Sequence, residues 1–389
     1  MHKFRLTVMS AGVASALLAS PSFAKDGISA GSDGVTFEAA DGNFELTLGG
    51  RLHLDAVRFS EDGDTDSDAD LRRARIELSG RIGKVVKFRV DREFAQGGGW
   101  RNLWVGIEPV ENFEIRGGNV IVPFSMEEIQ SSNRSALMER SHVTALAPGF
   151  SLGGMASYSG KFFTVSAGYF GNAIDSEDER GSERGKGLAG RVTAAPLLSK
   201  NGFVHLGAAI EHRDLDNGDE IRLSTKPGSQ LAPSLLSTGL IVGGSKLRNL
   251  GAEAAFSHGP FLLQGQYVRS RIDRNLLGDL AYGAWYAQAS LVVTGENYDY
   301  SRSTGTVAGV DVGKKGNAIE FAARISGIDL QDDSLRAGRG RTYTIGANYY
   351  LNRNVRFMVN YAHSKAKDIG LLDSDRKIDL VAGRLQLAF

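Results

Sequence analysis

The amino-acid sequence predicts an all-β protein, a transmembrane antiparallel β-barrel of about 16 strands. Three observations predict this fold. Most of the chain alternates apolar and polar residues with a period of two, the N-terminus has the features of a secretory signal, and the C-terminus is an alternating strand that ends on Phe389. A period of two places successive side chains on opposite faces of a strand, so one face can meet lipid and the other an aqueous lumen.

The N-terminal segment indicates export. Lys3 and Arg5 precede an apolar stretch over residues 6–19, and Ser22-Phe23-Ala24 places small residues at a cleavage position. This pattern is typical of a cleaved signal peptide over residues 1–24, whereas a membrane anchor would need a longer apolar core. We expect a short periplasmic segment over 25–42 and the barrel over 43–389, in the outer membrane of a Gram-negative bacterium.

The composition agrees with a large barrel. Cysteine is absent and 45 basic residues balance 45 acidic ones, so neither disulfides nor a nucleic-acid partner is expected. No run of about 18 apolar residues follows the signal, so no spanning helix is expected either. The roughly 365 residues after the signal exceed one β-sandwich, which disfavours a secreted soluble β protein.

The first strands show the period most clearly. Residues 44–57 alternate, an acidic stretch over residues 61–70 reads as an external loop, and residues 71–82 form a strand with an unusually charged face that carries Arg73 and Arg75. Gly83-Lys84 then makes a short turn into the next strand. Short turns at one end and long loops at the other are typical of outer-membrane barrels.

The alternation continues to the C-terminus. We count about sixteen segments, of which the short one at residues 221–224 is the least regular, and this class of barrel has an even number of strands. Between Arg116 and Pro148 the alternation fails. The residues 118–148 are too many for a turn and too mixed for a lipid-facing strand, so we expect them to fold inward as a functional loop that narrows the lumen.

Ten arginines are predicted to face the lumen: Arg73, Arg75, Arg81, Arg89, Arg116, Arg191, Arg213, Arg324, Arg356 and Arg384. They could form a path for anions, because a guanidinium binds oxyanions with a planar fork and stays charged. Alternatively, carboxylates on neighbouring strands neutralise them within the wall, which we expect for most of them. Arg73, Arg75 and Arg140 are the preferred candidates to face the permeating solute.

Arg72 poses a geometric problem, because adjacent residues of a regular strand point to opposite faces. Either a β-bulge turns Arg72 towards the lumen beside Arg73, or Arg72 lies at the rim beyond the lipid. Five aspartates at alternate positions over residues 62–70 lack the full pattern of a calcium loop. They are expected to be solvated, with loose bridging to lipopolysaccharide as the alternative. No catalytic group, cofactor or metal is expected.

The chain resembles the phosphate-selective porin O and P family. The resemblance covers essentially the whole mature sequence and rests on Leu71-Arg-Arg-Ala-Arg75, on Pro123-Phe-Ser-Met-Glu127 with Ser131-Ser132 and Glu139-Arg140, and on the segment 285–296 that ends in Thr-Gly-Glu. It implies a sixteen-stranded barrel, assembled as a homotrimer, whose third external loop folds in to form the constriction.

The resemblance also implies site residues. The positions that correspond to anion-binding residues in relatives are Arg72, Arg73, Ser131, Ser132 and Arg140, and Arg134 lies in the same loop. Three positions depart from the family pattern. Glu128 stands where relatives have a phosphate-binding lysine, Asn133 replaces a second lysine, and Asn102 stands at the place of an aspartate.

These residues predict a passive outer-membrane porin that prefers small anions, such as phosphate or related oxyanions. Glu128 makes a broader or different specificity, such as organic acids or other small solutes, the alternative. An outer-membrane barrel hydrolase is the alternative from another class, although the sequence carries no nucleophile signature. The expected partners are permeating anions, outer-membrane lipid and lipopolysaccharide, and two further copies of the chain.

Overall fold

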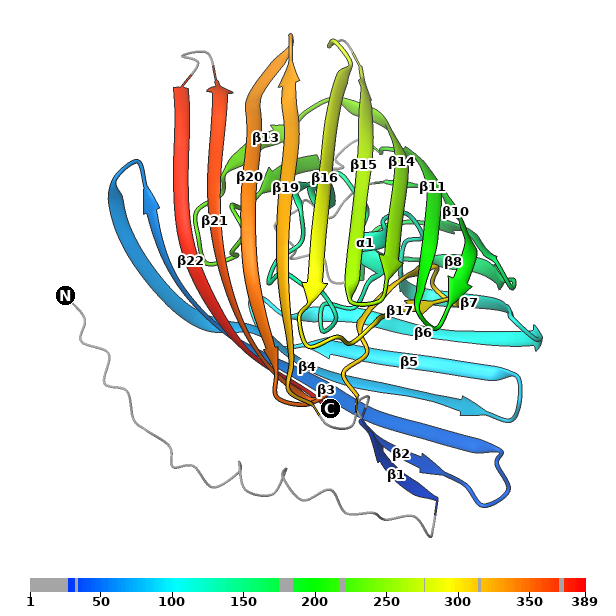
Figure 1. Ribbon diagram of the computed structural model, residues 1–389. Coiled ribbons are helices and arrows are strands. Elements are labelled where there is room, and N and C mark those ends of the chain that lie inside the picture. Colours follow the sequence, from blue (N-terminus) through cyan, green and yellow to red (C-terminus); the bar gives the residue numbers. More distant parts are fainter. Residues whose placement is uncertain are drawn as a thin grey trace.

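The computed structural model describes residues 27–31, 34–174, 185–216, 221–275, 277–313, 316–370 and 374–389. The expected signal peptide over residues 1–24 lies outside these ranges. Eighteen strands form the main sheet; β1 and β2 lie at its margin, and the other sixteen close into an antiparallel barrel (Figure 1). No helix in the described ranges is long and apolar enough to cross a membrane.

The barrel strands, in chain order, are β3 (Phe44–Glu61), β4 (Asp64–Ile82), β5 (Val86–Glu93), β6 (Gly99–Val110), β7 (Phe113–Ile121), β8 (Phe150–Ser159), β9 (Phe163–Phe170), β10 (Lys186–Ser199), β11 (Gly202–Asp214), β14 (Gly244–His258), β15 (Phe261–Arg274), β16 (Leu280–Val292), β19 (Ala318–Asp332), β20 (Leu335–Tyr350), β21 (Val355–Ile369) and β22 (Ser374–Ala388). The predicted fold class and strand number are therefore confirmed.

The alternating pattern explains both faces of the wall. In β21, Phe357 and Val359 are 46 % and 55 % exposed on the outside, whereas Met358 and Asn360 between them are 1 % exposed and face the interior. Each of the sixteen barrel strands is hydrogen-bonded to two neighbouring strands, so the described part of the wall presents no open strand edge to lipid. The apolar outer face therefore suits a membrane, and the polar inner face suits a solvated lumen.

The last strand closes the barrel against the first. β22 pairs with β3 from Ile378–Glu61 to Ala388–Arg51. The backbone of Phe389 then exchanges two hydrogen bonds with Gly50, of 2.6 and 3.0 Å. This closure leaves the barrel without a free edge. Before β3, the strands β1 (Ile28–Gly31) and β2 (Gly34–Glu38) form a hairpin whose second strand pairs with the start of β3.

The acidic stretch 61–70 is not the external loop that we expected. Asp64 to Asp70 belong to β4 and pair with the end of β3, and the connection is a two-residue turn at Asp62-Gly63. Both turn residues have positive φ, 48° and 107°, as two-residue hairpin turns require. The loop prediction was wrong because a strand that extends into water can carry charged side chains on both faces.

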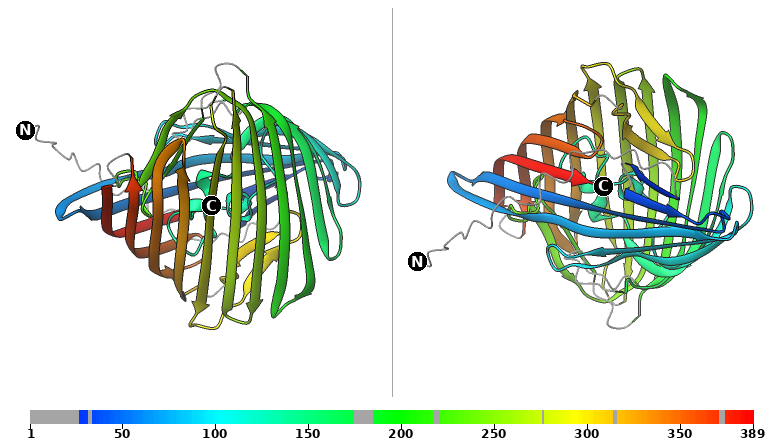
Figure 2. Two further views of the ribbon diagram at one scale, coloured as in Figure 1. Left: turned by 90° about the horizontal axis from the view of Figure 1, so that it is seen from above. Right: turned by 90° about the horizontal axis from the view of Figure 1, so that it is seen from below.

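The segment between β7 and β8 packs inside the barrel. It carries the short helix α1 (Met126–Ile129) and the 3-10 helix η1 (His142–Ala145), and Val122, Phe124 and Leu146 are fully buried in it. We refer to residues 122–149 as the inward segment. Figure 2, seen from above and below, shows it across the middle of the barrel.

Two further hairpins also lie off the barrel wall. The strands β12 (Ile221–Thr225) and β13 (Leu236–Ile241) pair with each other and belong to a separate sheet, so the prediction that residues 221–224 form a barrel strand was wrong. Buried Ile221 and Leu223 pack into the same core as the inward segment, which explains their alternation. The second hairpin consists of β17 (Tyr298–Ser301) and β18 (Thr306–Val310).

The β17–β18 hairpin departs from the expectation that one end of the barrel has tight turns alone. It lies in the connection between β16 and β19, at the end that otherwise carries short turns (Figure 1). The carbonyl oxygens of Thr304 and Gly305 accept hydrogen bonds from Arg191 of β10, and Tyr298 donates to Glu320 of β19 at 2.8 Å. The hairpin is thus held against the inner face of the wall.

Candidate functional site

A cavity of about 640 Å³ lies between the inward segment and the wall. Ten basic side chains line it among the described residues: Arg51, Arg72, Arg73, Arg75, Arg89, Arg101, Arg116, Arg140, Arg191 and Lys226. Three carboxylates line it as well: Glu93, Glu128 and Glu139. All of the site residues predicted from the sequence line this cavity except Arg134.

A β-bulge brings Arg72 and Arg73 to the same cavity. His53 of β3 pairs with Arg73, and the next residue, Leu54, pairs with Leu71, so Arg72 is the extra residue of the bulge. The bulge shifts the side-chain phase by one residue, and both guanidinium groups therefore reach the lumen side. Of the two alternatives for Arg72, the bulge is the observed one.

Arg72 is bound to a carboxylate of the inward segment. Its Nε and Nη2 atoms donate to Oε1 and Oε2 of Glu139 at 2.8 and 3.1 Å. Arg384 of β22 donates to the same Oε1 at 2.7 Å and also holds Asp55. Burial by itself would raise the pKa of Glu139, but Arg72, Arg384 and Arg73 outweigh it, and the pKa is lowered.

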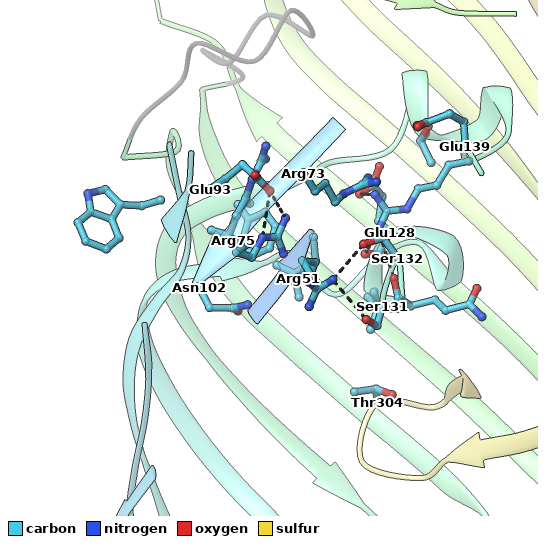
Figure 3. Close-up of a pocket in the computed structure, with 18 of the residues that line it drawn as sticks. Arg51, Arg73, Arg75, Glu93, Asn102, Glu128, Ser131, Ser132, Glu139 and Thr304 are labelled. Carbon is cyan, nitrogen blue, oxygen red and sulfur yellow. Dashed lines mark hydrogen bonds and ion pairs between the residues drawn. The ribbon is translucent and has the colours of Figure 1, made fainter. Parts of the chain in front are cut away.

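Arg73 forms no ion pair within the described residues. Its Nη1 atom lies 3.4 Å from Nδ1 of His53, and the side chain is 7 % exposed. A buried guanidinium without a carboxylate partner is costly, so it attracts any anion that reaches it. Figure 3 shows Arg51 directed at Ser131 and Ser132 of the inward segment, and Arg75 directed at Glu93 of the wall.

Arg51 was not among the predicted site residues. Its Nη1 atom donates to the hydroxyl of Ser132 at 3.0 Å and lies 3.5 Å from that of Ser131, and Nη2 pairs with Glu77 (Figure 3). The two serines that the family resemblance singled out therefore face Arg51 and not Arg72 or Arg73. Its position on the polar face of residues 44–57 was the signal that could have found it.

Two of the predicted residues are held on the wall. Arg75 pairs with Glu93 of β5 at 3.2 Å. Asn102 donates from Nδ2 to Asp91 at 2.6 Å, and its Oδ1 accepts a hydrogen bond from the indole of Trp104 at 3.3 Å. The amide of Asn102 thus stays beside a carboxylate, and Asp91 also receives Arg89 at 2.9 Å.

Glu128 and Arg140 form a pair within the inward segment, with Nη1 and Oε2 3.3 Å apart. Arg140 also donates to the backbone carbonyls of Glu127, Glu128 and Gln130, at 2.7, 3.1 and 3.2 Å. Through this ion pair and these three hydrogen bonds, Arg140 stabilises the backbone conformation of the inward segment. They also place the charge of Glu128 against a guanidinium, so that its effect on a passing anion is reduced.

Arg134 connects two lumen segments, since its Nη1 atom donates to the carbonyl oxygen of Ala308 in β18 at 3.1 Å. It lies outside the lining of the cavity. The Oδ1 atom of Asn133 accepts a hydrogen bond from Nε2 of His53 at 3.0 Å, so the second position that departs from the family pattern also contacts β3.

Most of the arginines predicted to face the lumen are neutralised, as expected. Eight of the ten form an ion pair with a carboxylate: Arg75, Arg81, Arg89, Arg116, Arg191, Arg213, Arg324 and Arg384. Several also hold the backbone of lumen segments. Arg324 donates to the carbonyl of Glu139 at 2.9 Å, and Arg356 donates to that of Ser135 at 2.9 Å. Wall arginines thereby satisfy carbonyl groups that the inward segment would otherwise bury unpaired.

His142 anchors η1 between two elements. Its ring nitrogens lie within hydrogen-bond distance of the hydroxyls of Thr225 in β12 and Thr342 in β20. Burial, with a further contribution from Arg324, lowers the pKa of His142 to about 3. In the parts of the chain that the structure describes, no three His, Asp or Glu residues are placed to hold a metal ion.

Comparison with known proteins gives a family match. The family model described as phosphate-selective porin O and P matches residues 46–389. Porin O of Pseudomonas aeruginosa is 25 % identical over 411 residues, which cover 92 % of this chain and 91 % of that protein.

Solved structures have the same fold. An anion-selective porin from Comamonas acidovorans is 16 % identical, with a TM-score of 0.56, over 89 % of this chain and 100 % of that one. The trimer form of OmpT, an outer-membrane protein of Vibrio cholerae, is 11 % identical, with a TM-score of 0.54, over 89 % and 99 % of the two chains.

Proposed function

Because the chain belongs to the phosphate-selective porin O and P family, and is an anion-preferring porin of the Gram-negative outer membrane, we propose that its anions are selected at the basic cavity. In this proposal, residues 118–148 form the constriction loop. Arg51, Arg72, Arg73 and Arg75 of the wall face it, and Ser131 and Ser132 present hydroxyls from the loop. Solutes pass by diffusion between these two sides.

The observation that carries the proposal is the excess of ten basic over three acidic side chains in the lining. Several of the carboxylates that pair with these arginines, such as Glu77 and Glu114, lie outside the lining. The lining of the cavity therefore keeps an excess of basic side chains, although several of them are paired. In a narrow, partly desolvated passage such an arrangement attracts anions more strongly than it would in bulk water.

Arg73 is the proposed principal anion contact. An anion at its guanidinium displaces no ion pair, whereas an anion at Arg72 or Arg75 has to compete with Glu139 or Glu93. A conducting site must also release its ion, and this competition keeps binding weak enough for passage. Glu128 adds a negative charge, but Arg140 offsets it.

The proposed assembly is a homotrimer in contact with outer-membrane lipid and lipopolysaccharide. The relative from Vibrio cholerae has a trimer form. The outer face of β7 to β10 carries several small residues, including Gly117, Gly154 and Gly190, and a flat wall allows another barrel to approach closely. The proposed processing is cleavage after residue 24, which leaves residues 25–42 on the periplasmic side.

The test is the reversal potential of the purified full-length protein in planar bilayers under a potassium chloride gradient. We expect the sign that belongs to chloride permeation. A potential of the opposite sign, which reports potassium permeation, would contradict the proposal. Electrophoresis of unheated and heated samples, combined with chemical cross-linking, tests the trimer.

A further inference from the structure

We propose that the preferred solutes of this porin are small organic monoanions with a flat apolar body, of the aryl carboxylate class. The proposal rests on the anion preference stated above and narrows it to one class of solute. It follows from the apolar residues that line the cavity beside the basic ones, because an inorganic oxyanion has no apolar surface to place against them.

The cavity has apolar walls as well as basic ones. Large apolar residues of the lining come from β6 to β8 and from the inward segment, and they include Trp104, Ile121, Pro123, Ile129, Phe150 and Met155. Organic ligands usually bind in cavities of about 300–1,000 Å³ that combine such surfaces with a few placed polar groups. The present cavity, of about 640 Å³, falls in that range.

Two of the aromatic rings pair with arginines. The guanidinium carbon of Arg116 lies 5.0 Å from the ring centre of Trp104, and that of Arg101 lies 5.9 Å from the ring centre of Phe150. Planar guanidinium and indole groups both accept a stacked aromatic ring. Trp104 is partly exposed, and it is fixed from the other end by the hydrogen bond from its Nε1 to Asn102.

The charged wall suits one negative charge better than two. Arg73 forms no ion pair within the described residues, whereas Arg72 and Arg75 are bound to Glu139 and Glu93. Inorganic phosphate, which at neutral pH is a mixture of monoanion and dianion and has no apolar surface, would lose hydration against the apolar walls without a compensating contact there. A carboxylate head at Arg73, with its ring towards the apolar wall, makes favourable contacts at both ends.

The experiment measures block of the chloride current in bilayers that contain the full-length protein. Sodium benzoate, sodium acetate and sodium phosphate are added separately at neutral pH. We expect benzoate to reach half-block at a concentration about tenfold below that of acetate, since burial and stacking of the ring add to the same carboxylate contact. We expect the half-blocking concentration of phosphate to be higher than that of benzoate.

Variants locate the effect. Trp104→Leu removes the ring that stacks, and Ile129→Ser removes an apolar side chain from the inward segment while it leaves the barrel wall intact. Each is expected to bring the half-blocking concentration of benzoate closer to that of acetate. The matched control is Trp285→Phe, because Trp285 of β16 lies on the outer face, where the indole contacts Gly327.

The outcomes separate the two proposals. Equal block by benzoate and acetate, or half-block by phosphate at a lower concentration than benzoate, overturns the aryl carboxylate assignment. If the reversal potential still reports chloride permeation, only this inference fails. A reversal potential that reports potassium permeation contradicts the basic selectivity site itself.

Discussion

Arg72 donates two hydrogen bonds to Glu139, from Nε to Oε1 at 2.8 Å and from Nη2 to Oε2 at 3.1 Å. A β-bulge in β4 aims the arginine inward, and the inward segment supplies the carboxylate. The contact joins the wall to the loop. The carboxylate of Glu139 also occupies the position in which an oxyanion would bind the paired N–H groups of Arg72.

The first prediction concerns this carboxylate. Glu139→Gln should make the guanidinium groups of Arg72 and Arg384 more available to permeating anions, because a neutral amide binds a guanidinium less tightly than a carboxylate does. We expect the half-blocking concentration of added anion to fall about tenfold, which corresponds to about 1.4 kcal/mol. Glu45→Gln, in an exposed pair with Arg81 near the short-turn end, is the control and should leave the block unchanged.

The second prediction concerns Arg73. Arg73→Gln removes a lining cation that has no ion pair within the described residues, so the permeability ratio of chloride to potassium should fall about fivefold or more. The barrel should remain as resistant to heat as the wild type, since no carboxylate loses its partner. A ratio equal to that of the wild type would exclude Arg73 as the principal contact. Arg339→Gln, at an exposed position, is the control.

The third prediction concerns the position that departs from the family pattern. Glu128→Gln removes a negative charge from the lining, but the three carbonyl contacts of Arg140 should keep the inward segment in place. We expect the permeability ratio of chloride to potassium to rise by a factor of about two to three, a small effect because Arg140 already offsets the charge. A larger conductance with lower selectivity would instead mean that the segment had moved.

The fourth prediction concerns pH. The folded-state pKa of His142 is about 3, below the 6.5 of an exposed histidine, so the folded chain binds fewer protons than the unfolded one between these values. Above about pH 6.5 His142 is neutral in both states, and it does not lower the free energy of unfolding. Below that pH the unfolded chain takes up the proton first, so the free energy of unfolding falls by about 1.4 kcal/mol per pH unit. Single-channel currents should become noisier between about pH 6 and about pH 4 as η1 loosens.

The matched variant for the pH prediction is His142→Gln, whose side chain can still bond to a hydroxyl but does not titrate. It should flatten the dependence of current noise on pH. His212→Gln changes an exposed histidine and should behave like the wild type. If His142→Gln keeps the full dependence, another group is responsible.

The sequence by itself determined the barrel. A period of two is a local property, because each strand needs only its own residues to present an apolar and a polar face. The same reasoning found the inward segment, as a break in the period, and placed the predicted arginines on the inner face. It misjudged residues 64–70 and 221–224. A strand that extends beyond the lipid, or lies within the lumen, does not need one apolar and one polar face in the way that a membrane-spanning strand does.

The tertiary structure decided which charges are left for a permeating anion. Arg384 and Glu139 are separated by 245 positions, and their contact depends on where the inward segment meets β22. The bulge that turns Arg72 inward and the serines opposite Arg51 depend in the same way on register and loop placement. An alternating pattern shows that an arginine faces the lumen; whether a carboxylate already holds it is a property of distant residues brought together.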